Sequence, residues 1–218
     1  MIAPIPEVER ILVSRYGSYP DESSSPVLDQ LVWFALSTRT TVENCEAAYS
    51  ALRARYPSWA EVAEAESEYI GECIRPAGLY RGRTTNLLGA FAAIEKRFGE
   101  LSLEGLRSWG TEDAEAFLLS LPGVGLKVAR CVLSFGLGRR SFAVDTHIWR
   151  ITRRLGWHAF SGDTPTKAGA DAIQAIAQKA NDPLSLHVDL IRFGREICRA
   201  GESDCSDCPL AAFCPKVL

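Results

Sequence analysis

Residues 121–129 read Leu-Pro-Gly-Val-Gly-Leu-Lys-Val-Ala, and this stretch decides the fold. Apolar residues recur every three or four positions before it and continue directly after it, so the pattern predicts two helices joined by a short turn over about residues 112–136. Gly123 and Gly125 can adopt positive φ and have no Cβ, so their amides can approach an external oxygen atom. The N–H groups and dipole at the start of the second helix favour an anion such as a phosphate. A purely structural helical hairpin is an equally good interpretation of these residues alone.

Lys127 lies in the first turn of the predicted second helix, where a cation opposes the helix dipole. That position and its apolar neighbours disfavour the protonated amine, which makes Lys127 a usable nucleophile. Eighteen residues later, the stretch Val-Asp-Thr-His-Ile over residues 144–148 leads into another helical pattern. Asp145 is placed to cap that helix, and capping alone is its structural interpretation. A carboxylate also stabilises positive charge on a nearby amine, so Lys127 and Asp145 together predict a site for imine chemistry.

The two motifs, LPGVGLK over residues 121–127 and VDTHI over residues 144–148, resemble those of the helix-hairpin-helix DNA glycosylases, above all their endonuclease III branch. The lysine and the aspartate of these motifs are the catalytic pair of that family, so the resemblance implies this role for Lys127 and Asp145. It also implies base-excision repair: a damaged pyrimidine leaves duplex DNA through a lysine Schiff base, and β-elimination follows at the abasic site. Gly123, Gly125 and His147 are then expected to contact the DNA.

A third segment, Leu-Ser-Thr-Arg over residues 36–39, resembles a Leu-Ser-Ala-Gln-type segment of the family. The family's glutamine enters the space that the extruded base leaves in the DNA. This chain carries Arg39 at the glutamine position, which opens the question of substrate preference and leaves the general chemistry unchanged. An arginine bound to a phosphate or a carboxylate is an equally good interpretation of Arg39.

A fourth segment, Gly-Leu-Tyr over residues 78–80, resembles a family turn whose leucine is a wedge beside the flipped nucleotide. Leu79 matches that leucine, and Arg81 and Arg83 follow closely enough to contact phosphates. The structural alternative is a helix C-cap at Gly78, with Leu79 as its hydrophobic contact.

Four cysteines near the end of the sequence have the spacing C-x6-C-x2-C-x5-C: Cys198, Cys205, Cys208 and Cys214. Disulfides, a structural zinc site and an iron–sulfur cluster are all compatible with four cysteines, although no secretion signal supports disulfides. The same spacing belongs to the iron–sulfur loop of endonuclease III and its adenine-glycosylase relatives. The resemblance therefore implies a [4Fe–4S] cluster in a loop over residues 198–214.

Helical periodicity is interrupted by Pro and Gly roughly every 15–20 residues, and no strand-like alternation occurs, so the sequence predicts an all-α fold. The expected helices include one continuous helix over residues 59–74. We expect two helical lobes. Residues 27–140 form a helical barrel domain that contains the hairpin, and residues 1–26 join residues 141–218 in an iron–sulfur cluster domain.

The composition is that of an ordinary folded protein, with 218 residues, 47% hydrophobic and 23% charged, and a net charge of −3. That charge argues against a broadly basic surface but allows a local basic face for duplex DNA that contains damaged bases or abasic sites. No apolar run approaches the roughly 18–20 residues that span a bilayer, and no signal-like segment opens the chain. We therefore expect a cytoplasmic, nucleoid-associated monomer without a membrane partner.

Two other functions fit parts of the sequence. One is a monofunctional glycosylase for a mismatched or modified base, because residues 118–127 and 142–157 are also similar to plant 5-methylcytosine glycosylases. Lys127 disfavours an adenine-specific function for this chain, because the adenine-specific relatives typically lack a lysine at this position. The other is a non-catalytic DNA-binding scaffold, suggested by Arg39 and the acidic charge balance. The presence of both Lys127 and Asp145 disfavours it.

Overall fold

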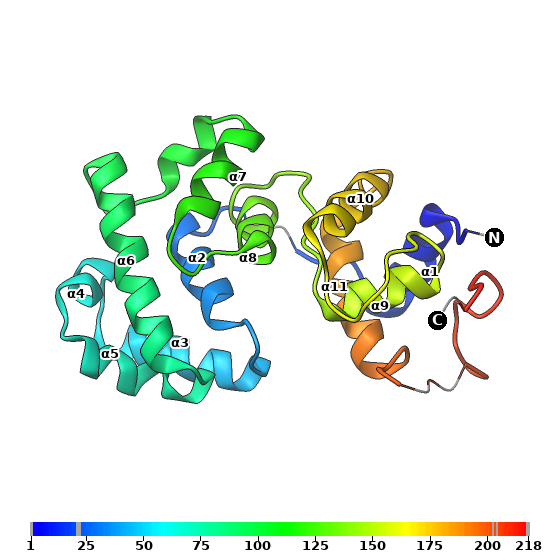
Figure 1. The fold of residues 1–218 in the computed structure, drawn as a ribbon, viewed down its shortest axis with the longest axis horizontal. Coiled ribbons are helices and arrows are strands. Elements are labelled where there is room, and N and C mark those ends of the chain that lie inside the picture. Colours follow the sequence, from blue (N-terminus) through cyan, green and yellow to red (C-terminus); the bar gives the residue numbers. More distant parts are fainter. Residues whose placement is uncertain (1, 21–22, 202, 204, 217–218) are drawn as a thin grey trace. The chain divides into compact units, whose positions relative to one another are not determined.

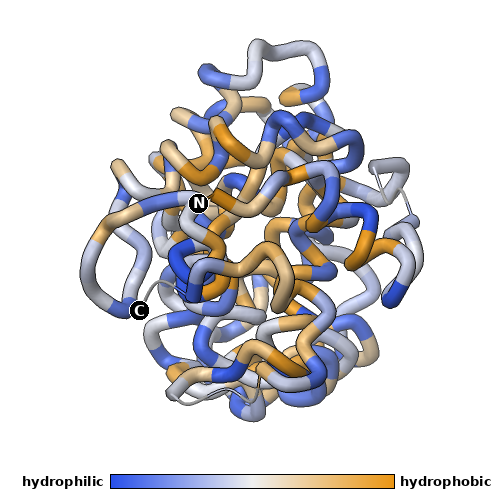
Figure 2. The backbone as a smooth tube through the Cα atoms, turned by 90° about the vertical axis from the view of Figure 1, so that its right-hand side faces the viewer, coloured by the Kyte–Doolittle hydropathy of each residue, from blue (hydrophilic) through white to orange (hydrophobic). Residues whose placement is uncertain are grey.

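All regular elements in the computed structural model are helices (Figure 1). The structure describes residues 2–20, 23–201, 203 and 205–216, and within these ranges no strand occurs. The predicted all-α fold is therefore confirmed. No helix in the described part of the chain is long and apolar enough to cross a membrane. Hydrophobic and hydrophilic segments alternate along the tube of Figure 2, as expected for helices that bury one face.

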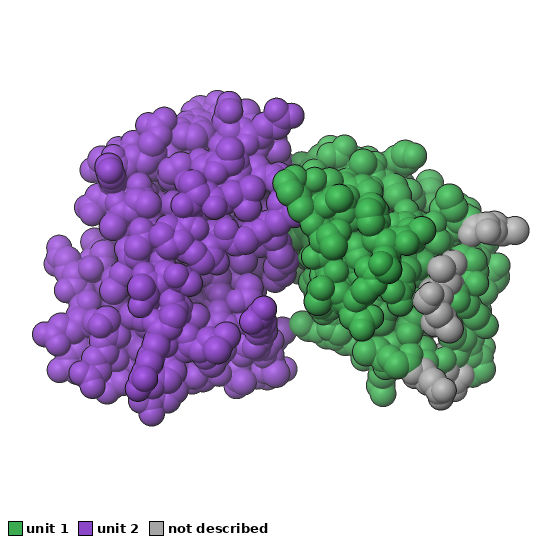
Figure 3. All heavy atoms as spheres, in the orientation of Figure 1, with its two compact units in different colours: residues 1–21, 140–218 green, residues 22–139 purple. Residues whose placement is uncertain are grey.

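The chain divides into two compact units, which Figure 3 shows in different colours. Residues 22–139 form one unit, called here the hairpin unit. Residues 1–21 and 140–218 form the other, called here the terminal unit. Each unit has its own set of packed helices, and we describe each by itself.

The central helix of the hairpin unit is α2 (Val27–Leu36), in which six of the ten side chains are buried. It packs against α3, α6, α8 and the π-helical turn that follows α8, which explains why its sequence is apolar nearly all round. The other elements of this unit are α3 (Val42–Arg55), α4 (Trp59–Glu64), α5 (Ser67–Ile74), α6 (Tyr80–Phe98), α7 (Thr111–Ser120), α8 (Leu126–Cys131), the π-helical turn (Val132–Gly136), and 3-10 turns at Arg75–Ala77 and Glu104–Ser108.

Residues 59–74 form two helices, so the prediction of one continuous helix is wrong. Ala65 and Glu66 are extended, with ψ values of 149° and 136°, and they separate α4 from α5. The break allows α5 to pack against both α3 and α6, while α4 packs against α6. Tertiary packing has overridden the helical propensity of these residues.

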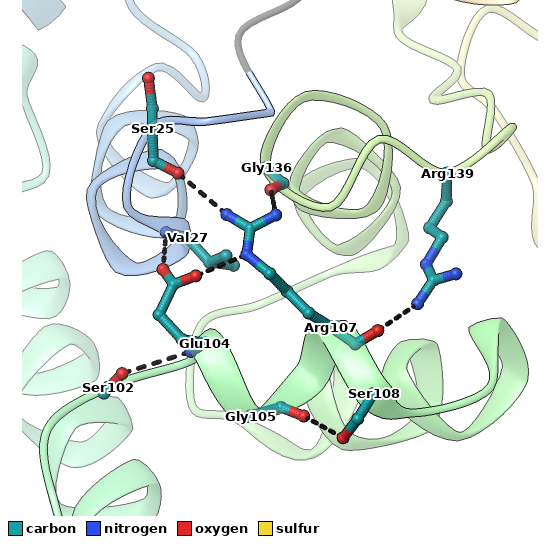
Figure 4. A network of polar contacts seen from close by, with 9 residues as sticks. All are labelled: Ser25, Val27, Ser102, Glu104, Gly105, Arg107, Ser108, Gly136 and Arg139. Carbon is teal, nitrogen blue, oxygen red and sulfur yellow. Dashed lines mark hydrogen bonds and ion pairs between the residues drawn. The ribbon is translucent and has the colours of Figure 1, made fainter.

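Arg107 connects three segments of the hairpin unit in the network of Figure 4. Its side chain donates to Glu104 at 2.6 Å, to the carbonyl of Gly136 at 3.0 Å and to the carbonyl of Ser25 at 3.3 Å. The carboxylate of Glu104 also accepts from the backbone N–H of Val27 at 2.8 Å. The network thus ties the start of α2 to the end of the π-helical turn, and so fixes the helix that follows the hairpin.

The terminal unit is organised around α11 (Pro183–Glu196), which packs against α1 (Ile5–Tyr16) and α9 (Thr146–Arg154). Its remaining helix is α10 (Lys167–Ala177). Glu9 of α1 is buried, and its carboxylate accepts from the backbone N–H groups of Asn181 and Asp182 at 2.9 and 2.6 Å. A buried carboxylate of this kind needs such donors, because an unpaired charge in the interior is costly.

Candidate active site

Lys127 lies in the first turn of α8, as predicted, with Gly125 at the N-cap and no capping side chain. Its side chain is half-buried, and Nζ lies 5.7 Å from the centre of the Phe34 ring on α2. The buried thiol of Cys45 is also close: burial raises its pKa to about 11, against the opposing charges of Arg83 and Lys127. The amine is therefore held at a helix start over a largely apolar surface.

The two glycines of the hairpin differ in conformation. Gly123 has φ +77°, and a Cβ at this position would lie 2.7 Å from Cβ of Asn86 on α6. Gly125 has φ −94°, and a Cβ there would meet nothing within 4 Å. Gly125 therefore does not use the positive φ that glycine allows, and it is an extended N-cap residue. Gly123 is needed for the turn, whereas Gly125 leaves open space before the start of α8.

Four of the residues that were predicted to contact DNA line a cavity of about 700 Å³ in the hairpin unit. Arg39, Leu79, Arg81 and Gly123 all line it, although they come from three separate segments of the chain. Asn86 lines the cavity as well. Asn86 could not be singled out from the sequence, because no local pattern marks an exposed helical asparagine as a neighbour of the hairpin.

Arg39 and Leu79 both adopt the left-handed backbone conformation, with φ 52° and 51°. Within the described residues, Lys216 is the one other non-glycine residue with positive φ. Gly78 does cap the 3-10 turn Arg75–Ala77, with φ 73°, as the structural alternative expected. Leu79 is 66% exposed, however, so it does not pack as the hydrophobic contact of that cap. Left-handed non-glycine residues are strained and cluster at functional sites, which agrees with their position on the cavity.

Arg83 does not face outward toward a phosphate, contrary to the prediction. Its Nε donates to the carbonyl of Gly78 at 2.8 Å, and Nη1 donates to the carbonyl of Ala35 at 2.6 Å and to Oγ1 of Thr38 at 3.0 Å. Nη2 donates to the carbonyls of Thr38 and Ala77. An arginine has five N–H donors, and these five bonds use all of them.

Asp145 caps α9 in the terminal unit, as predicted, and its Oδ1 accepts from the backbone N–H of Ile148 at 2.8 Å. His147 in the first turn is half-buried, and its Nδ1 lies 3.2 Å from Nη2 of Arg150. Arg150 also donates to the carbonyl of Cys198 at 2.8 Å. The first turn of α9 is therefore linked through Arg150 to the start of the cysteine loop.

The four predicted metal-ligating cysteines line a single cavity of about 430 Å³ in the terminal unit. Its wall also contains apolar side chains, including those of Ile151, Leu155 and Phe193. Within the described residues, no group of three or more His, Cys, Asp or Glu side chains is arranged to hold a metal ion. The cavity brings the four cysteines to one place.

The chemistry of this cavity suits a thiolate-bound metal centre. Burial raises the pKa of the Cys208 and Cys214 thiols, and the neighbouring cysteines raise both further, so four thiolates here need a cation to neutralise them. Nη1 of Arg154 donates to Sγ of Cys198 at 3.1 Å, and Nη2 donates to the carbonyl of Gly201 at 2.8 Å. The all-sulfur donor set fits an iron–sulfur cluster, and Arg154 is a contact that the sequence analysis missed.

Comparison with known proteins places the chain in a family. Residues 32–181 match the family described as HhH-GPD superfamily base excision DNA repair protein. The chain is 32% identical to an endonuclease III of a Synechocystis species, over 85% of this chain and 80% of that protein. It is 29% identical to the endonuclease III of Thermotoga maritima, over 96% of this chain and 92% of that protein.

A solved structure described as a non-covalent endonuclease III–DNA complex has the same fold. Its TM-score is 0.76 at 24% sequence identity, and the match covers 96% of this chain and 92% of that one. The family match spans more than half of the chain, and the Synechocystis relative agrees with it. This protein therefore belongs to the HhH-GPD superfamily of base excision DNA repair proteins, in its endonuclease III branch.

Proposed function

We propose that this protein is a DNA glycosylase with abasic-site lyase activity, and that it removes damaged pyrimidines from duplex DNA. The observation that carries the proposal is Lys127, an amine in the first turn of α8 that directly follows the Gly123 turn and lies over the Phe34 ring. Membership of the endonuclease III branch supports the activity, since the relatives of this name are enzymes of base excision repair.

The chemistry begins with extrusion of the damaged nucleotide, because C1′ of its sugar cannot be reached inside the stacked duplex. Lys127 in its neutral form attacks C1′, the glycosidic bond breaks, and the base departs with the bonding electrons and takes up a proton. Asp145 stabilises the positive charge that develops on the sugar. Loss of the amine proton and opening of the sugar ring then give a Schiff base between Nζ and C1′.

The second step breaks the strand. A base removes a proton from C2′ of the Schiff base, and the electrons expel the 3′ phosphate in a β-elimination. Hydrolysis of the remaining imine releases Lys127 for the next cycle. A lysine nucleophile is required for this step, because a water nucleophile would leave an abasic site without a covalent link to the protein.

The proposed DNA contacts are Arg39, Leu79, Arg81 and Gly123 on the 700 Å³ cavity, Gly125 at the start of α8, and His147 in the first turn of α9. We also propose that Cys198, Cys205, Cys208 and Cys214 hold a [4Fe–4S] cluster. The bound cluster would cross-link a loop that has few apolar side chains of its own. On this proposal the hairpin unit is the helical barrel domain, and the terminal unit is the cluster domain.

Borohydride trapping tests the lyase assignment. Duplex oligonucleotides carry thymine glycol, uracil opposite guanine, or a bare abasic site, and each is incubated with wild type, Lys127→Ala and, as a matched control, Lys96→Ala. We expect a covalent adduct with wild type and the control, and none with Lys127→Ala. Base loss without an adduct on any substrate would mean a monofunctional glycosylase. Binding without base loss or nicking would mean a DNA-binding scaffold, and would refute the proposal.

A further inference from the structure

Arg83 contacts the backbone directly before each of the two left-handed residues on the 700 Å³ cavity. The carbonyl of Thr38 belongs to the peptide that precedes Arg39, and the carbonyl of Gly78 belongs to the peptide that precedes Leu79. Arg83 donates to both carbonyls from one guanidinium group. Its position in the first turn of α6 places it between the two segments, and its side chain is half-buried.

These contacts matter because the left-handed conformation is unfavourable for a residue with a Cβ. Such a residue crowds its own Cβ against the neighbouring carbonyl, so the free chain tends to leave this conformation. The orientation of the preceding peptide determines φ of the residue that follows. A donor that holds the carbonyl of that peptide therefore opposes relaxation. Arg83 holds both peptides at once, and its other three bonds anchor it to Ala35, Ala77 and Oγ1 of Thr38.

A lysine cannot make the same set of bonds. The guanidinium presents five donors in a rigid planar fork, whereas an ammonium presents three donors from a single nitrogen atom. The acceptors of Arg83 lie on two segments, residues 35–38 and residues 77–78. Nη1 reaches the first segment, Nε reaches the second, and Nη2 donates to both. Replacement by lysine keeps the charge but leaves at most three of these five bonds, all from one nitrogen atom.

We propose that Arg83 is a positioning residue that locks Arg39 and Leu79 into one rigid element, so that both side chains enter the duplex together when a nucleotide is extruded. This inference rests on the proposed function. It assigns Arg83 to the protein backbone, while Arg39 and Leu79 meet the DNA. Asn86, one turn further along α6, lies directly against Gly123, so side chains from the start of α6 contact all three segments of the cavity.

The test is a double-mutant cycle of Leu79→Ala, Arg83→Lys and the double variant, with Arg97→Lys as the control arginine on the exposed side of α6. Single-turnover base excision is measured on the duplex that wild type cleaves, and extrusion is followed by the fluorescence of 2-aminopurine beside the lesion. Misplacement of a group by 1 Å can cost about 100-fold in rate. We expect each single variant to lose at least about 10-fold in excision and in the fluorescence change, and Arg97→Lys to behave as wild type.

The cycle separates positioning from a general loss of structure. If Arg83 acts through Leu79, the double variant loses no more than the more damaged single variant, because interacting residues are not additive. Borohydride trapping on a single-stranded abasic oligonucleotide, which needs no extrusion from a duplex, should remain within about twofold of wild type in Arg83→Lys and Arg97→Lys.

Three results overturn the inference: losses that multiply, trapping that falls in parallel with excision in Arg83→Lys, or excision by Arg83→Lys at the wild-type rate. Failure of the proposed function is a different result, because wild type itself would then neither excise a base nor form an adduct. A thermal melt accompanies each variant. If Arg83→Lys does not fold, Arg83→Gln, which retains two donors on a planar head, takes its place in the cycle.

Discussion

Replacement of Gly123 by alanine should destabilise the protein, whereas the same replacement at Gly125 should not. Gly123 has φ +77°, and its added Cβ would lie 2.7 Å from both Cβ and Nδ2 of Asn86. Gly125 has φ −94° and open space around its Cβ position. The two glycines are two residues apart in one turn, so each is the natural control for the other.

The magnitude follows from two contributions. The left-handed conformation costs an alanine roughly 1–2 kcal/mol relative to glycine. The contact with Asn86 adds to this, because Cβ of Asn86 is fixed to α6 and cannot move away without a shift of the helix. Together these contributions predict a loss of about 2–3 kcal/mol in the free energy of unfolding for Gly123→Ala. Gly125→Ala should change the free energy of unfolding by less than about 1 kcal/mol, because alanine restricts the unfolded chain but is a poorer N-cap residue than glycine.

Urea titration followed by circular dichroism measures both variants, with the m-value as the check that the unfolding transition is unchanged. Asn86→Gly in the Gly123→Ala background separates the two contributions, since it removes the collision and leaves the backbone strain. Gly125→Ala should weaken the binding of abasic duplex despite its normal stability, because the methyl group occupies space before α8. Equal stability of the two alanine variants would refute this account of the hairpin.

Three further predictions concern the terminal unit. Asp145→Asn should retain the α9 cap and the stability of the protein but lose about 100-fold or more in base excision, whereas Asp145→Ala should also lose about 1 kcal/mol in urea titration. Asp189 is fully buried, which raises its pKa to about 6. The folded state therefore binds more protons than the unfolded state between about pH 4 and 6, and stability should fall by on the order of 2 kcal/mol as pH rises through this window. Asp189→Asn should abolish that slope in pH-dependent thermal melts. Arg154→Gln should lower the iron content per purified chain, measured by a colorimetric iron assay, because it removes the donor to Sγ of Cys198 and loosens the cysteine loop.

Features that depend on a few neighbouring residues could be predicted from the sequence. The hairpin, the position of Lys127 in the first turn of α8 and the cap at Asp145 all follow from local patterns, and all three are present. The broken helix over residues 59–74 could not be predicted, because no proline or glycine marks Ala65 and Glu66 as a break. The roles of Lys127 and Asp145 in catalysis stay predictions that trapping and excision assays test.

Arg83 shows why the rest of the site could not be predicted from the sequence. Its acceptors on Thr38 and Ala35 lie 45 and 48 residues before it. An arginine that follows a glycine turn can equally bind a phosphate or hold a distant loop, and only the tertiary structure decides between the two. The same applies to Gly123, whose added Cβ would meet Asn86 of α6, a residue 37 positions earlier in the chain. Such long-range contacts leave no periodic signal in the chain.

The two left-handed positions on the cavity carry side chains where glycine would be less strained. Glycine would occupy both positions without backbone strain, yet the chain has arginine at position 39 and leucine at position 79. Neither side chain is buried, and Leu79 exposes 66% of its surface, so packing within the protein does not account for either choice. Backbone strain that no packing contact within the protein explains is typical of residues that contact a ligand or partner. Together with the cavity that both residues line, this supports the proposal that the turns at 39 and 79 meet the DNA, and it gives a reason for the half-buried arginine of α6 that holds them.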